Sequence, residues 1–207
     1  MPRKSIVTRG GDGGETGLLY GGRVRKTDSR TEAYGAVDEA ISALGLARAQ
    51  VRDRGRAAAI LRLQEELFTV GAELATDPAE YETLRKHFLV ITPAHTQRLE
   101  EEVHALEAAV ALPDAFVVPG GSVAGASLDL ARTVVRRAER RIVALADRAA
   151  LPNPELLRYV NRLSDLVFML ARAEEGSAQR ALQGRRVVRR PAAPDRIPRA
   201  RKDRSRR

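Results

Sequence analysis

The 207-residue sequence contains no cysteine and no tryptophan, and aromatic residues make up only 4% of it. Without cysteine, disulfide bonds and thiolate metal sites are excluded. The three histidines, His87, His95 and His104, are too scattered to predict a metal site. No apolar run approaches the roughly 20 residues that span a bilayer, and the first ten residues lack the apolar segment of a secretory signal. We therefore expect a soluble, cytoplasmic protein whose core is built mainly from leucine, valine and alanine.

The net charge of +9 is concentrated at one end of the chain. Residues 184–207 contain eleven of the 36 basic residues but only two of the 27 acidic ones, so the remaining 25 basic and 25 acidic residues balance. We expect residues 1–183 to form one domain and the tail to be disordered, because it has too few apolar residues to offset the entropy of ordering. A basic tail can serve solubility or bind a polyanion. One candidate function is therefore a non-enzymatic helical-bundle adaptor that binds RNA or an acidic partner.

Apolar residues recur at steps of three and four from residue 30 onward, which is the spacing of amphipathic helices. The pattern predicts helices over residues 30–51, 56–77, 92–113, 122–152 and from 153 onward. Thr92 and Asn153 are suited to cap a helix, because each precedes a proline. Apart from the short SIVT of residues 5–8, no segment alternates as a strand does. Five helices with short connections predict an all-α, up-and-down bundle.

The fourth predicted helix carries four charged residues on one face, beside its apolar stripe. Arg132, Arg136, Glu139 and Arg140 stand at i, i+4, i+7 and i+8 in ARTVVRRAERR. One interpretation is a solvated face whose ion pairs contribute a few tenths of a kcal/mol each. The other is a ridge of guanidinium groups that binds a polyphosphate, because arginine binds phosphate oxygens bidentately and keeps its charge.

Polar residues also interrupt the apolar stripes of the first and fifth predicted helices. Asp38 follows the core residue Val37, so we expect its carboxylate to be partly buried and paired with an arginine. Asn161 and Asp165 lie beside the core stripe in NRLSD, where a buried amide needs hydrogen-bond partners. Each is open to a structural interpretation at the edge of the core. Together they place polar groups of three helices near one seam, as bundles do when they build ligand sites.

Seven glycines lie within TRGGDGGETGLLYGG, residues 8–22. The stretch is not a Walker A loop, because the chain contains no Gly-Lys pair. It does not fit the dinucleotide fingerprint either, because Thr16 stands at the third glycine position and no βαβ unit is predicted. Two interpretations remain. It is a loose leader, or its amides form an anion nest with Thr8, Thr16 and Lys26 as further donors.

Three segments together resemble the ATP:cob(I)alamin adenosyltransferases of the PduO type. They are TRGGDGGETGLLYGGRVRKTDSRTEAYGAVDE, FVVPGGSVAGASLDLARTVVRRAERRIVAL and NPELLRYVNRLSDLVFMLAR, and the resemblance covers roughly residues 6–175. It implies a five-helix bundle that assembles as a homotrimer, with an active site in each groove between neighbouring subunits. It also implies that cobalt(I) of reduced cobalamin attacks the 5′ carbon of ATP, with tripolyphosphate as the leaving group and magnesium carried on the phosphates. A cobalamin reductase would supply the reduced substrate, an adenosylcobalamin-dependent mutase is a candidate recipient of the product, and neither a membrane nor a nucleic acid is an expected partner.

The resemblance assigns roles to particular residues. It implies an ion pair of Asp38 with Arg132 across the subunit boundary, and Phe116 packed under the corrin in place of the lower axial ligand. The implied ATP-binding residues are Thr8, Arg9, Gly10, Gly11, Thr16, Gly17, Lys26, Arg136, Arg137, Ala138, Glu139, Arg140 and Asn161. Gly13 departs from the family, which commonly has lysine or arginine there. We expect the glycine-rich segment to be disordered until ATP binds.

Overall fold

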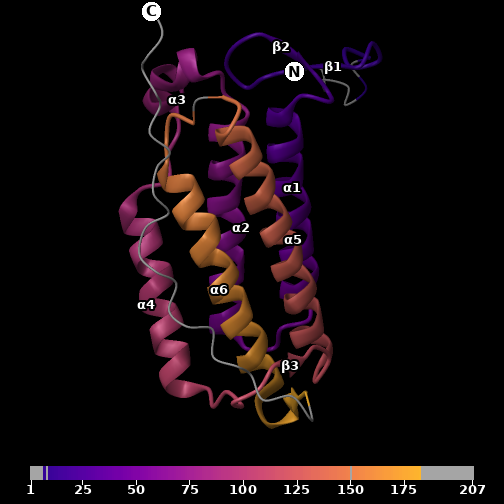
Figure 1. Ribbon diagram of the computed structural model, residues 1–207, viewed down its shortest axis with the longest axis vertical. Coiled ribbons are helices and arrows are strands. Elements are labelled where there is room, and N and C mark those ends of the chain that lie inside the picture. The colour runs from indigo at the N-terminus through magenta and orange to yellow at the C-terminus, as the bar shows by residue number, and fades with distance from the viewer. Residues whose placement is uncertain (1–6, 8, 150, 183–207) are drawn as a thin grey trace, which may run out of the picture.

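The computed structural model describes Val7 and residues 9–149 and 151–182 of the chain. The predicted all-α bundle is confirmed, since five long helices run side by side along the long axis of the molecule (Figure 1). These helices are α1 Ser29–Arg48, α2 Arg54–Leu74, α4 Pro93–Ala109, α5 Val123–Ala146 and α6 Glu155–Glu175. Helix α5 packs between α1 and α6, while α2 packs on α1 and α4 packs on α6.

Side-chain caps set where most of these helices begin. The carboxylates of Asp28 and Asp53 accept hydrogen bonds from main-chain N–H groups at the starts of α1 and α2, and Ser122 Oγ does so at the start of α5. Thr92 forms the predicted cap of α4, with His95 completing a capping box. The fifth predicted helix begins one residue later than expected, with Pro154 as the cap position and Asn153 Oδ1 accepting from the N–H of residue 155 at 3.1 Å.

The core is a single cluster of mainly aliphatic side chains from α1, α2, α5 and α6, with Leu99 of α4 and Ile91 just before it. The apolar stripes predicted for the long helices supply it. Its fully buried members include Leu44, Leu67, Leu99, Leu128, Ile142 and Leu163. Burial of such stripes stabilises helices that would be marginal alone.

Several short elements were not predicted. A 3₁₀ turn (Pro78–Glu80) leads into a seven-residue helix, α3 (Tyr81–His87). Another 3₁₀ turn (Gly176–Ala178) follows α6. Four short strands form two antiparallel pairs: β1 (Glu15–Gly17) with β2 (Arg23–Arg25), and β3 (Val117–Val118) with β4 (Arg180–Ala181). The expectation that no strand exists beyond residues 5–8 is therefore wrong, and that stretch lies outside the described residues except for Val7.

The glycine-rich segment folds into the β1–β2 hairpin, while the expectation that ATP binding orders it stays a prediction. Its far turn is joined to the end of α2, because Leu19 N donates to Ala75 O at 2.8 Å and Asp77 N donates to Tyr20 O at 2.9 Å. Gly21 takes a φ of 109°, and a Cβ there would lie 2.6 Å from the Cβ of Asp77. Glycine at position 21 is thus what allows the hairpin to approach α2 so closely.

Candidate active site

Helix α5 presents the predicted ridge of charged side chains toward α6 and solvent. Arg136 and Arg140 are exposed, while Arg132 and Glu139 are half-buried beside core residues. The neighbouring cation, Arg137, turns the other way and forms an ion pair with Glu39 of α1. Arg132 and Arg136 therefore lie on the α6 side of α5. Arg137 points toward α1 and is not part of this ridge.

A hollow of about 310 Å³ lies against this ridge, between α4, α5 and α6. Arg132 and Arg136 line one part of it, and Asp165, Phe168 and Met169 of α6 line another. Phe168 was not singled out from the sequence, where it reads as an ordinary core position. The hollow sets two guanidinium groups beside an apolar floor, with the carboxylates of Glu107 and Asp165 also in its lining, so it offers charged and apolar surface to one ligand.

A second hollow, of about 320 Å³, is lined by Glu139, Asn161 and Arg162 among others. Asn161 Nδ2 donates to Glu139 Oε1 at 2.8 Å, and Arg162 Nη1 donates to Asn161 Oδ1 at 2.8 Å. Arg162 Nε in turn donates to Glu100 of α4 at 2.8 Å, and this hydrogen bond raises the pKa of Arg162 against the opposing effect of burial. The predicted need of Asn161 for partners is confirmed, and its amide orientation is fixed from both sides.

Two predicted residues are placed differently from expectation. Ala138 is only 1% exposed and packs in the core, so its side chain cannot contact a ligand. Asp38 is exposed rather than partly buried, because each helical residue turns about 100° from its neighbour and Val37 already points into the core. Asp38 has no hydrogen bond or ion pair with any residue that the structure describes, so its expected arginine partner is not among them.

The hairpin gathers the predicted glycine-loop residues at one end of the bundle, near the start of α1 (Figure 1). Thr8 lies outside the described residues. Gly11 leaves room for Lys26, since a Cβ there would lie 2.9 Å from the Lys26 ammonium nitrogen. The remaining predicted residues here are Arg9, Gly10, Thr16 and Gly17, of which Thr16 alone is not fully exposed.

Arg23 was missed in this loop, although its position in a glycine-rich, basic hairpin is a usable signal. Its guanidinium donates to Gly10 O at 2.5 Å and to Glu15 O at 3.3 Å, which holds the turn against the strand pair. The N–H groups of Gly10, Gly11 and Gly13 donate to no acceptor among the residues described. Unpaired amides beside cationic side chains can bind an anion.

Phe116 lies at the other end of the bundle, just before β3 (Figure 1). Its side chain is 65% exposed, while its carbonyl accepts a hydrogen bond from Leu182 N at 2.7 Å. The main chain is therefore held in place while the ring is left free to contact a ligand.

The structure thus brings together Arg132, Arg136, Glu139 and Asn161, and places the hairpin and Phe116 apart from each other. No group of three or more His, Asp or Glu side chains that could hold a metal occurs among the residues described. No helix in the described part of the chain could cross a membrane.

Comparisons with known proteins agree with this geometry. The family model for cobalamin adenosyltransferase matches residues 6–174. The chain is 41% identical over 170 residues to a corrinoid adenosyltransferase of Citrobacter freundii, covering 82% of this chain and 94% of that protein. It is 40% identical over 186 residues to the corrinoid adenosyltransferase PduO of Salmonella typhimurium, covering 86% of this chain but 52% of that protein. The chain therefore spans about half the length of this longer relative.

Solved structures give the same result. A variant of the PduO-type ATP:corrinoid adenosyltransferase from Lactobacillus reuteri, complexed with cobalamin and ATP, superposes with a TM-score of 0.79 at 33% identity, over 87% of this chain and 99% of that one. A second variant of that enzyme, complexed with ATP, superposes with a TM-score of 0.77 at 32% identity, over 87% and 100%. These relatives do not support the adaptor alternative.

Proposed function

The chain belongs to the cobalamin adenosyltransferase family, and on that premise we propose that it transfers the 5′-deoxyadenosyl group of ATP to reduced cob(I)alamin, forming adenosylcobalamin. The Co–C5′ bond forms as the bond from C5′ to the triphosphate oxygen breaks, and tripolyphosphate leaves with the bonding electron pair. The nucleophile belongs to the corrinoid substrate, so the protein binds and aligns the reactants rather than supplying a reacting group.

The observation that carries this proposal is the hollow beside α5. It sets the guanidinium groups of Arg132 and Arg136 against the ring of Phe168 in one cavity. A nucleotide that gives up its triphosphate next to an apolar macrocycle needs both kinds of surface. The complexes of the Lactobacillus reuteri enzyme with cobalamin and ATP support the same pair of substrates.

In this proposal the β1–β2 hairpin and the charged ridge of α5 bind the anionic triphosphate of ATP. The proposed ATP-binding residues are Thr8, Arg9, Gly10, Gly11, Thr16, Gly17, Lys26, Arg136, Arg137, Glu139, Arg140 and Asn161. Cationic donors stabilise the charge that develops on the leaving tripolyphosphate, so their effect is largest in the transition state. Magnesium bound to the phosphates would add to that charge stabilisation. Because Arg137 pairs with Glu39, its contribution requires a nucleotide that competes with this carboxylate.

In this proposal Phe116 contacts the corrinoid substrate. An apolar ring packed under the corrin excludes a lower axial ligand, which leaves cobalt four-coordinate and easier to reduce. The exposed side chain of Phe116 on a held main chain supports this role.

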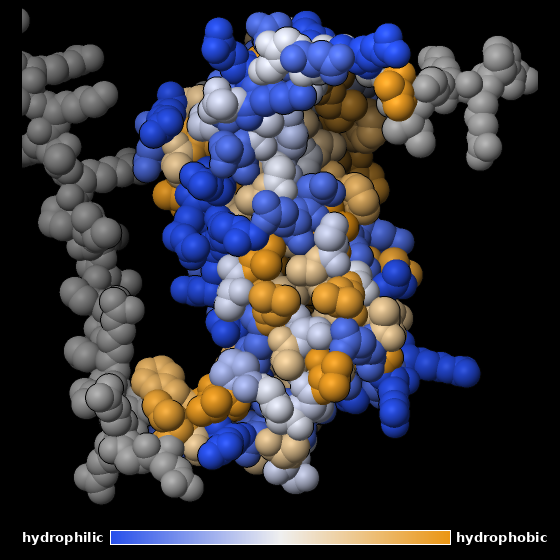
Figure 2. Space-filling model, turned by 90° about the vertical axis from the view of Figure 1, so that its right-hand side faces the viewer, coloured by the Kyte–Doolittle hydropathy of each residue, from blue (hydrophilic) through white to orange (hydrophobic). Residues whose placement is uncertain are grey.

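We also propose that the active enzyme is a homotrimer with its sites between subunits. The hairpin and Phe116 of one chain lie at opposite ends of the bundle, so one chain does not bring both to one ligand. Asp38, which has no partner among the described residues of its own chain, would pair with Arg132 of a neighbour. Figure 2 shows hydrophobic side chains exposed on the lower half of the α1–α5 face, where Leu46, Val123 and Leu130 are more than half exposed. Such a surface suits burial by a neighbouring copy.

Further features of the proposal concern the surroundings of the enzyme. Residues 1–183 would form the catalytic domain, and residues 184–207, all outside the described structure, a basic tail. The enzyme would work in the cytoplasm with a cobalamin reductase as its source of reduced substrate, and an adenosylcobalamin-dependent mutase would receive its product.

The direct test is to incubate the protein with ATP, magnesium and chemically reduced cobalamin and to follow the absorption spectrum of adenosylcobalamin. We expect product to appear with release of one tripolyphosphate per corrinoid, and not when ATP or protein is omitted. Deleting residues 184–207 should leave the rate largely intact. The absence of product from the full chain would overturn the proposed function.

A further inference from the structure

A network of buried charged side chains joins α5 and α6 at the end of the bundle near β3. Asp129 of α5 and Arg172 and Glu175 of α6 are 3%, 1% and 5% exposed. Charged groups this deeply buried are costly unless they are paired. We propose that this network couples the position of Arg132 to the position of the loop between Phe116 and α5, an inference that rests on the proposed function for the roles of those two residues.

The first half of the network ends on Arg132. The Arg172 guanidinium forms an ion pair with Asp129 Oδ2, and Arg132 Nε donates to Asp129 Oδ1 at 3.1 Å. One carboxylate therefore holds two guanidinium groups. Because Asp129 is enclosed, Arg132 cannot keep this bond in a different rotamer.

The Arg132 side chain is 26% exposed and lines the hollow beside α5. Its bond to Asp129 uses Nε, while its two terminal nitrogens donate to no acceptor in the described part of the chain. Its guanidinium carbon lies 5.9 Å from the centroid of the Phe168 ring, and that of Arg172 lies 5.0 Å from the same centroid. Asp129 and Phe168 thus fix the stem of Arg132 and leave its terminal nitrogens free for a ligand or a neighbouring carboxylate.

The second half of the network ends on the loop. Arg172 Nη2 lies 3.1 Å from Glu175 Oε2, and Glu175 Oε1 accepts hydrogen bonds from Gly121 N at 2.9 Å and Gly120 N at 3.3 Å. A Cβ on Gly121 would lie 2.6 Å from Ala178 O, and one on Gly125 would lie 2.6 Å from Glu175 Cγ. The glycines allow the loop and α5 to close tightly on this carboxylate, so the loop after Phe116 is set by the position of Glu175.

Arg172 is shared between Asp129 and Glu175, so these three buried side chains carry a formal charge of −1. Arg132 supplies the balancing positive charge, and it is a partly exposed arginine that lines the hollow. Contacts run without a break from Gly121 through Glu175, Arg172 and Asp129 to Arg132. They link the loop after Phe116, the residue assigned to the corrinoid, with Arg132, the residue assigned to the subunit boundary. Asp129, Arg172 and Glu175 are therefore positioning residues, since they act through Arg132 and the loop.

The test compares Asp129→Asn with the wild-type chain and with the control Asp147→Asn, which changes an exposed residue at the other end of α5. Amide hydrogen exchange reads the loop at residues 117–122. We expect exchange there to be faster by about fivefold or more in Asp129→Asn, although Asp129 does not touch the loop, with no change at residues 60–70 of α2. Unchanged exchange in the loop, or an equal rise in α2, would overturn the coupling.

Turnover provides the second readout. In Asp129→Asn we expect kcat to fall by about tenfold to a hundredfold with an unchanged KM for ATP, as when a catalytic group is misplaced. A loss confined to KM would contradict the inference. Glu175→Gln removes the charge at the loop end of the same network and should also lower kcat. It therefore tests the coupling if Asp129→Asn does not fold. Should the wild-type chain form no adenosylcobalamin, the proposed function fails, while the exchange measurement still decides the coupling.

Discussion

The two ends of the bundle are each closed by a two-stranded antiparallel sheet, yet they are built in opposite ways. At one end, β1–β2 holds a glycine-rich turn through main-chain bonds and the Arg23 guanidinium, and its cationic side chains face outward. At the other end, beside β3–β4, the buried carboxylate of Glu175 holds the loop that follows β3, and the ring of Phe116 is left exposed.

This difference shows how one helical scaffold can offer two unlike surfaces. The first end presents unpaired amides and positive charge, which suit phosphates. The second presents an apolar ring on a fixed main chain, which suits a flat apolar ligand. Helices α5 and α6 run between them and α5 carries the arginine ridge, so the comparison can be tested at either end or along the ridge.

The largest effect is expected at the apolar end. Phe116→Ala should weaken productive corrinoid binding by about 2–4 kcal/mol, the cost of truncating a central aromatic anchor. Electron paramagnetic resonance should show the loss of four-coordinate cob(II)alamin, while calorimetry shows unchanged ATP binding.

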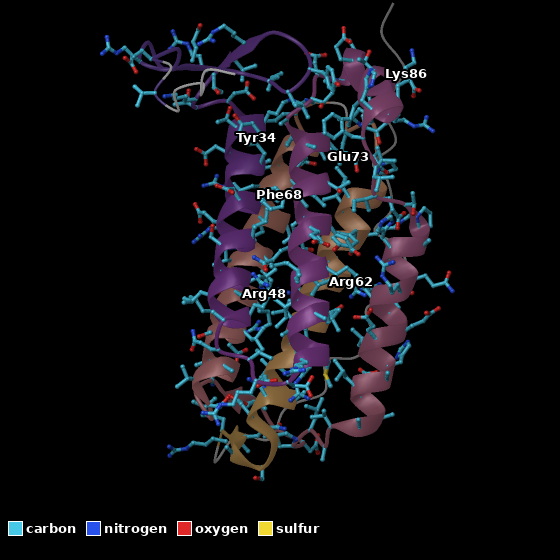
Figure 3. All side chains as sticks on the ribbon, turned by 180° about the vertical axis from the view of Figure 1, so that it is seen from behind. Tyr34, Arg48, Arg62, Phe68, Glu73 and Lys86 are labelled. Atoms are coloured by element: carbon cyan, nitrogen blue, oxygen red, sulfur yellow. The ribbon has the colours of Figure 1, made fainter. Side chains whose placement is uncertain are left out.

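The matched control is Phe68→Ala, because Phe68 is 62% exposed against 65% for Phe116 but lies on α2 (Figure 3). It should leave the spectrum unchanged. An unaltered spectrum in the Phe116 variant would remove that residue from the site.

Along the ridge, Arg136→Ala should weaken ATP binding by about 1.5–3 kcal/mol, the usual range for a hydrogen bond to a charged group. Calorimetry measures this loss directly. Arg148→Ala, an exposed arginine just beyond α5, should bind ATP as the wild type does. Equal affinities of the two variants would sink the assignment of Arg136.

At the polar end, Gly21→Ala should strain the hairpin by about 1–3 kcal/mol, because alanine rarely adopts a φ of 109° and its Cβ would collide with Asp77. Exchange of the Leu19 and Asp77 amides should be faster by about 5- to 150-fold. In Gly22→Ala, where a Cβ meets nothing within 4 Å, these amides should exchange as before. Similar rates in both variants would show that the close approach at Gly21 does not hold the hairpin.

The smallest effect is expected from Gly13→Lys, which restores the cation common in the family. A Cβ there meets nothing within 4 Å, so we expect tighter ATP binding by about 0.2–1 kcal/mol, as for an exposed ion pair. The gain should vanish at high salt. A gain that persists at high salt would argue against an electrostatic contact with phosphate.

The long helices could be predicted because their apolar stripes extend over several turns. In α5, for example, Leu128, Val135 and Ile142 recur every seven residues and are all fully buried. Helix α3 was missed because seven residues with Leu84 as their only buried member give no stripe. The strands were missed because two or three residues cannot alternate visibly, and β3 pairs with a segment more than 60 residues away.

For the site, sequence spacing placed Arg132 and Arg136 on one face, and the hollow beside them is consistent with that. It could not place the buried network, because Asp129 and Arg172 look like the charged residues that border any helix stripe. A usable signal was present, since Asp129 with Arg132 and Arg172 with Glu175 are opposite charges three residues apart on helices that face each other. Only tertiary packing shows that these two pairs meet. Arg62 and Glu73 on α2 illustrate the same point, because both pair with residues that follow α2 in the chain (Figure 3).

The attachment of Leu182 to Phe116 has a practical consequence for probes. An affinity tag or dye joined soon after Leu182 would pull on the strand that frames the aromatic ring. The exposed side chain of Ala105 on α4 belongs to neither sheet and lines neither hollow. Because the sequence contains no thiol of its own, Ala105→Cys would give a uniquely labelled enzyme for fluorescence studies.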